Sequence, residues 1–142
     1  MADFLQVAIF IAGLGQLVLA AASAFIPRQL GWREKLGGVD PLLRRIFWVY
    51  AAYILGTNVA LGLVSTFASG ALVEGGSLAF AVNVYAAVYW GARLVIQLVW
   101  FRGLAPEGLK FRVAETALVL LFVFLSSTYV VAAARTAIEV PV

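Results

Sequence analysis

Residues 77–102 read SLAFAVNVYAAVYWGARLVIQLVWFR, and this apolar stretch decides the fold of the chain. It is longer than the ~18 residues that mark a candidate transmembrane helix. Three polar side chains, Asn83, Arg93 and Gln97, interrupt it. An arginine at the centre of a bilayer costs about 2.5–3.5 kcal/mol on insertion scales. Arg93 therefore needs a partner or solvent, which the rest of the chain has to provide.

The composition of the whole chain is that of a membrane protein. Of its 142 residues, 64% are hydrophobic and 12% are charged, whereas a soluble domain is about 25% charged. The apolar residues fall into four blocks, at residues 4–26, 42–67, 77–101 and 109–134. The sequence therefore predicts an all-α integral membrane protein, a four-transmembrane-helix bundle that forms a single membrane domain over residues 1–142.

Local signals set the expected ends of these helices. Pro27 is expected to end the first helix, and Asp40 followed by Pro41 is a typical helix start. Ser77 is expected to cap the third helix, after a short loop over residues 69–76. The first block is expected to be a retained helix and not a signal peptide, because the only charge ahead of it is Asp3.

Basic residues predict the orientation of the bundle. Eight of them lie in or beside the first-to-second and third-to-fourth loops: Arg28, Arg33, Lys35, Arg44, Arg45, Arg102, Lys110 and Arg112. The opposite side has only Arg135. The positive-inside rule predicts that both basic loops are cytoplasmic and both termini extracytoplasmic, as expected for the bacterial inner membrane. These side chains are expected to contact lipid headgroups, so the net charge of +3 does not indicate nucleic-acid binding.

Small and polar residues mark faces of the first two helices that are expected to pack. Gly13 and Gln16 belong to a small, slightly polar face of the first helix, and small residues let helices approach closely in lipid. On the second helix, Asn58, Gly62 and Ser65 share one face. Asn58 lies deep in the apolar block, so its amide is expected to bond to a neighbouring helix.

The polar residues of the third helix are aligned. Two sets spaced by seven interleave into one seam, namely Asn83, Trp90 and Gln97 with Ala86, Arg93 and Trp100. This alignment favours a face turned into protein and a buried Arg93. The alternative is that Arg93 extends toward the cytoplasmic interface, although Cβ bonds lean toward the helix N-terminus, away from that interface.

Glu115 is the expected counter-charge of Arg93, because it is the only acidic residue close to membrane depth. The prediction is an Arg93–Glu115 pair that is extended by Gln97 and by one of Tyr53, Thr57 or Asn58. Glu115 has competing partners at the interface, Arg112 and the Arg44–Arg45 pair. A pairing there contributes little energy. The seam therefore either packs against other helices or lines a cavity that binds a ligand.

The chain contains no histidine and no cysteine, which removes many kinds of chemistry. Histidine-ligated haem, iron–sulfur clusters and thiolate zinc sites lack their ligands, so no cofactor and no metal site is expected. Ser-His-Asp and Cys-His catalysis lack their base. One carboxylate at membrane depth is not an acid–base pair. The sequence therefore favours a protein that is not an enzyme, with no catalytic residues.

Four short segments carry a resemblance to known proteins: Pro27-Arg28, residues 31–34 (GWRE), residues 47–50 (FWVY) and residues 91–97 (GARLVIQ). In these segments the chain resembles an uncharacterised family of small four-helix bacterial membrane proteins. The outline of four helices also resembles DoxX-like proteins, without a specific motif. The resemblance implies the helical fold and brings no activity or ligand.

Two functions fit these observations. One is an accessory or assembly subunit, or a homo-oligomer, built from helices lined with glycine and alanine. The other is a binder or transporter of lipid or a hydrophobic small molecule. In that case Arg93, Gln97 and Asn83 line a cavity, and Arg93 holds an anionic or carbonyl group.

Overall fold

The computed structural model describes residues 1–101 and 107–138. Within this part of the chain the protein is all-helical. Four helices are long and apolar enough to cross a membrane: α1 (Ala2–Gln29), α3 (Pro41–Phe67), α5 (Ser77–Val99) and α6 (Leu109–Ile138). Two short helices, α2 (Trp32–Lys35) and α4 (Ser69–Glu74), lie in the connections at opposite ends of the bundle.

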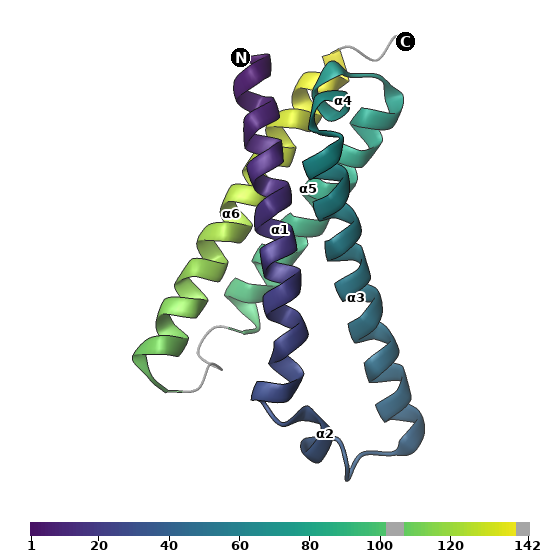
Figure 1. Ribbon diagram of the computed structural model, residues 1–142, viewed down its shortest axis with the longest axis vertical. Coiled ribbons are helices and arrows are strands. Elements are labelled where there is room, and N and C mark those ends of the chain that lie inside the picture. Colours follow the sequence, from purple (N-terminus) through teal and green to yellow (C-terminus); the bar gives the residue numbers. More distant parts are fainter. Residues whose placement is uncertain (102–106, 139–142) are drawn as a thin grey trace.

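The four long helices form two antiparallel pairs (Figure 1). α1 packs mainly against α3, and α5 packs mainly against α6. The pairs come together near α4, where α1 also contacts α6. Toward the α2 end they diverge, so that α6 and α3 point away from each other. The start of α1 and the end of α6 both lie at the α4 end.

Glycines bring α1 and α3 into close contact. A Cβ atom on Gly13 would lie 2.7 Å from the backbone nitrogen of Thr66 and 2.9 Å from the carbonyl oxygen of Gly62. A Cβ atom on Gly62 would lie 2.9 Å from the side chain of Leu17. Because no side chain fits here, the two backbones approach as small residues allow in lipid. The predicted packing faces of the first two helices therefore meet each other.

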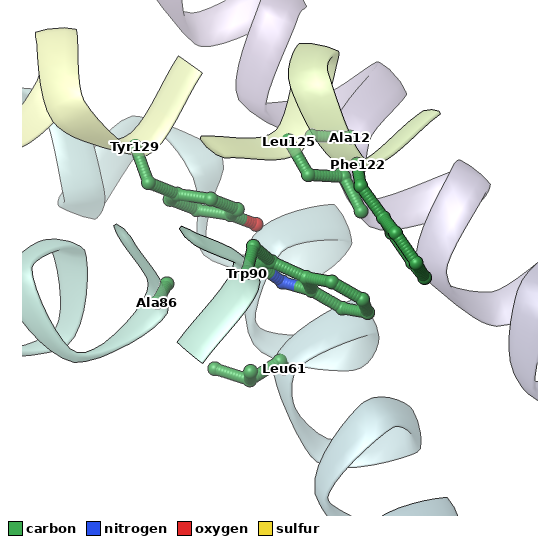
Figure 2. Close-up of a cluster of buried hydrophobic side chains, with 7 residues drawn as sticks. All are labelled: Ala12, Leu61, Ala86, Trp90, Phe122, Leu125 and Tyr129. Atoms are coloured by element: carbon green, nitrogen blue, oxygen red, sulfur yellow. The ribbon is translucent and has the colours of Figure 1, made fainter. Parts of the chain in front are cut away.

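The core lies where the two pairs join (Figure 2). Its largest members are Trp90, Tyr129 and Phe122, all fully buried, and Leu61 and Ala86 pack beside them. The Trp90 and Phe122 rings lie 5.6 Å apart between centroids. α5 and α6 thus bury aromatic rings against each other and against α3, which fixes the angle between the two pairs.

Several predicted helix ends were correct and others were wrong. Asp40 does cap α3, because its carboxylate accepts hydrogen bonds from the backbone of Leu42 at 2.9 Å and Leu43 at 3.3 Å. Pro27 does not end α1, which continues to Gln29. Proline cannot donate a hydrogen bond to the preceding turn, but the carbonyls around it remain usable. The Ile26 carbonyl accepts from the backbone of Leu30 at 3.0 Å.

The connection over residues 69–76 was predicted as a loop, and that prediction was wrong for its first six residues. They form α4, and its Leu72 and Val73 are buried against α1 and α6. Ser77 does not cap α5, because Gly76 occupies the cap position with a φ of 93°. α6 ends at Ile138, about one turn beyond the predicted residue 134. Arg102, expected beside the third-to-fourth loop, lies outside the described residues.

Candidate ligand-binding site beside Arg93

Arg93 lies six residues before Val99, the last residue of α5. At 1.5 Å per residue this is about 9 Å inside the end of the helix. Its side chain is half-buried, and its guanidinium carbon lies 5.6 Å from the centroid of the Phe122 ring. This distance is within the range of a cation–π interaction. The Nε atom is buried and has no hydrogen-bond partner.

Arg93 faces a cavity of about 500 Å³ between the two helix pairs. The walls come from the last turns of α1, from Trp32 of α2 and from the first half of α3. Most of them are apolar or aromatic, including Phe47, Trp48 and Leu55. Clefts of about 300–1,000 Å³ with apolar walls and few polar groups are typical of sites for small molecules. Among the described residues, Arg93 is the only charged one on this wall.

Asn58 is one of the uncharged polar residues on the cavity wall, together with Ser23 and Tyr50. It is buried in α3, and its side-chain oxygen accepts a hydrogen bond of 2.7 Å from the hydroxyl of Tyr89. Tyr89 precedes Arg93 by four residues, so the two side chains lie on the same face of α5. This hydrogen bond links α3 to α5 and confirms the expectation that Asn58 bonds to another helix. It also places the Tyr89 hydroxyl beside the Asn58 side chain, which lines the cavity.

A second pocket, of about 480 Å³, adjoins the first at the α2 end. Arg28, at the end of α1, and Arg33, in α2, both line it. Three residues, Ala24, Pro27 and Trp48, line both pockets. The basic pocket and the cavity beside Arg93 are therefore neighbours that share a wall.

Glu115 does not lie in the Arg93 cavity. It lines a separate groove of about 580 Å³ between α5 and α6, together with Gln97 and Arg112. The predicted Arg93–Glu115 pair is therefore not formed. Gln97 lines the same groove as Glu115. Arg112 lines the same groove as Glu115, without an ion pair between the two side chains. Arg93 lines its cavity with residues of α1 and α3, whereas Glu115 lines the groove between α5 and α6.

The predicted seam on α5 is buried only in its first half. Asn83, Ala86 and Trp90 are buried, but Gln97 is half-buried and Trp100 is 71% exposed. Because the helix pairs diverge toward the α2 end (Figure 1), the second half of the seam loses its protein neighbours. Asn83 has a structural role. Its side-chain nitrogen donates a 2.9 Å hydrogen bond to the carbonyl of Leu72, close to the end of α4.

One buried polar cluster was not predicted. The Gln16 amide donates a 2.5 Å hydrogen bond to the hydroxyl of Tyr129, which also bonds to the hydroxyl of Ser65. The three residues are almost fully buried and belong to α1, α6 and α3. Gln16 interrupts the first apolar block as Arg93 interrupts the third. The same argument from polar residues at membrane depth would have found it.

The remaining basic residues of the sequence prediction line the surface. Lys35, Arg45 and Lys110 are exposed, and Arg44 is half-buried at the start of α3. They belong to α2 and to the starts of α3 and α6, and these helix ends lie at the same end of the bundle (Figure 1). Of the first-loop group, only Arg28 and Arg33 line the basic pocket.

Comparison of the chain with protein-family models, curated proteins and solved structures found no match. The function is therefore argued from the geometry around Arg93.

Proposed function

We propose that this protein binds a hydrophobic molecule that carries an anionic or carbonyl group, in the cavity between the two helix pairs. The observation that carries the proposal is Arg93, whose Nε atom has no hydrogen-bond partner among the described residues and whose cavity is lined mainly by apolar and aromatic side chains. A buried donor without a partner costs about 1–3 kcal/mol, and more when it is charged. A ligand that supplies the missing acceptor recovers that cost.

The same arrangement suits a molecule taken up from the bilayer. The apolar walls of the cavity accommodate a hydrocarbon chain, and the guanidinium provides a fixed charge for the head group. The basic residues of the α2 end favour a cytoplasmic position for the basic pocket, by the positive-inside rule. The protein is then an inner-membrane protein that takes its ligand from the cytoplasmic leaflet.

The test is a binding measurement with dibromostearate, a fatty acid whose bromine atoms quench tryptophan fluorescence. Trp32 and Trp48 line the cavity and serve as reporters. We expect saturable quenching of the purified protein in mild detergent. Arg93→Met is expected to weaken binding about 10-fold or more, because a hydrogen bond to a charged group contributes about 1.5–3 kcal/mol.

Arg112→Met is the matched control, because it removes one positive charge near the same end of the bundle but from the Glu115 groove. We expect its affinity to stay within about twofold of wild type, since exposed charges contribute little energy. Equal affinities for wild type and Arg93→Met would contradict the proposal. So would quenching that rises without saturation.

A second candidate is an accessory subunit or a homo-oligomer. The outer face of α3 favours it, because Ala52, Gly56 and Ala60 form a groove there with nothing within 4 Å of a Cβ atom on Gly56. Small residues at this spacing let a second helix approach. Native mass spectrometry from mild detergent tests it, and a strictly monomeric protein without partners would count against it.

A further inference from the structure

The structure assigns a route and a ligand class to the proposed function. We infer that the pocket of Arg28 and Arg33 is the first binding site of a single-chain amphiphile with an anionic head group, which then moves to Arg93. The inference rests on the proposed function, and it adds the charge of the ligand and the place where the ligand is captured.

The chain builds this pocket through a tight turn. α1 ends at Gln29 and α2 begins at Trp32, and Gly31 between them has a φ of 62°. This left-handed conformation strains any residue with a side chain. The turn places Arg28 and Arg33 around one pocket. Arginine is the residue best suited to hold a carboxylate or phosphate, because its planar fork donates two parallel hydrogen bonds.

The charge of the pocket is positive but small. Glu34 also lines it, so the two arginines and one carboxylate leave a net charge of one. A pocket of one sign raises the local concentration of an oppositely charged ligand and its association rate. Because Arg28 and Arg33 are exposed, the field reaches solvent and weakens with salt. This positive charge attracts the head group without holding it as tightly as a buried site would.

The wall that the two pockets share lies on the proposed path of the ligand from the basic pocket to Arg93. Ala24, Pro27 and Trp48 line both the basic pocket and the cavity beside Arg93. Trp48 belongs to an aromatic cluster in which the Trp32 and Phe47 rings lie 5.2 Å apart. A head group that passes this wall exchanges two hydrated arginines for one partly desolvated arginine. The interaction of the head group with Arg93 is stronger than its interaction with Arg28 or Arg33, because the surroundings of Arg93 are less polar.

The size of the cavity suits one hydrocarbon chain. A group the size of a water molecule occupies about 30 Å³, so 500 Å³ corresponds to about 17 groups of this size. That is close to one long hydrocarbon chain. Fatty acids and lysophosphatidates share the required chemistry, an anionic head group on one chain.

The test is the association rate of two brominated probes, dibromostearate and a lysophosphatidate with the same chain, followed by stopped-flow tryptophan quenching. For the double variant Arg28→Gln/Arg33→Gln we expect an association rate about tenfold lower at low salt. The dissociation rate is expected to stay within about twofold, because the final site at Arg93 is intact. Glu34→Gln is expected to raise the association rate. The probe that shows the larger effects identifies the head group.

The matched control is Lys35→Gln/Arg45→Gln, which removes the same charge from the same end of the bundle but outside the pocket. If the association rate fell equally in this control, general surface charge and not the pocket would explain the effect, and the inference would be overturned. Unchanged rates in the Arg28→Gln/Arg33→Gln variant would overturn it as well. In both cases the loss of affinity in Arg93→Met would still support the proposed function, so the two failures are distinguishable.

Discussion

Tyr129 shows how single polar residues hold this bundle together. Its hydroxyl lies between Gln16 of α1 and Ser65 of α3, so one side chain of α6 joins three helices. All three side chains are almost fully buried. Lipid offers no hydrophobic force that pulls helices together, so polar contacts of this kind carry much of the specificity. Arg93 is the charged member of a small group of buried side chains with a polar atom that has no partner among the described residues, a group that also includes the Gln16 Oε1 atom.

Tyr129→Phe removes the hydroxyl and nothing else. We expect it to lower the free energy of unfolding by about 1–2 kcal/mol, because two interhelical hydrogen bonds are lost at roughly 0.6 kcal/mol each on average. Unfolding by sodium dodecyl sulfate in mixed micelles measures this change. Tyr53→Phe is the control, since Tyr53 is 72% exposed on the outer face of α3. Equal effects of the two substitutions would rule out the assigned role of Tyr129.

At the level of the helices, the pairing of α1 with α3 depends on close backbone contact. Gly13 and Gly62 lie at the crossing, where each leaves space for the other helix. The predicted small-residue faces therefore form the close contact between α1 and α3. The pairing of α5 with α6 depends instead on large rings, Trp90 and Phe122 among them. The two pairs are built by different means, and they meet only over part of their length.

Gly13→Ala tests this crossing. The added methyl group would lie 2.7 Å from the backbone nitrogen of Thr66, and a backbone atom cannot move aside as a flexible side chain does. We expect a loss of about 1–3 kcal/mol in the free energy of unfolding, as is typical of overpacked cores. Gly56→Ala is the control, because a Cβ atom there meets nothing within 4 Å. A Gly13→Ala protein as stable as this control would disprove the close crossing.

At the scale of the whole molecule, the two helix pairs converge at the α4 end and diverge at the α2 end (Figure 1). The convergent end holds the buried core and the anchored α4. The divergent end holds the cavity of Arg93 and the basic pocket. The cavity begins at the edge of the main core, because the Arg93 guanidinium carbon lies 5.6 Å from the ring of Phe122, a core residue.

The orientation of the molecule is directly measurable because the chain has no cysteine. Gly38→Cys, beside α2, and Ala71→Cys, in α4, each introduce one exposed thiol without changing a charge. We expect a membrane-impermeant maleimide to label Ala71→Cys in intact cells, and Gly38→Cys only after the membrane is opened. The cysteine-free wild type is the control for background labelling. The reverse pattern would place the basic pocket outside the cytoplasm.

The sequence by itself determined the four long helices and the Asp40 cap, and it singled out Arg93 as a candidate residue. Each depends on local properties: the length of an apolar block, a capping side chain and the cost of a charge in lipid. The tertiary structure decided which side of α5 meets which neighbour. It placed Glu115 in a groove away from Arg93 and formed the Gln16–Tyr129 contact across 113 residues. These outcomes depend on the angle between two helix pairs, which is set by packing over the whole bundle.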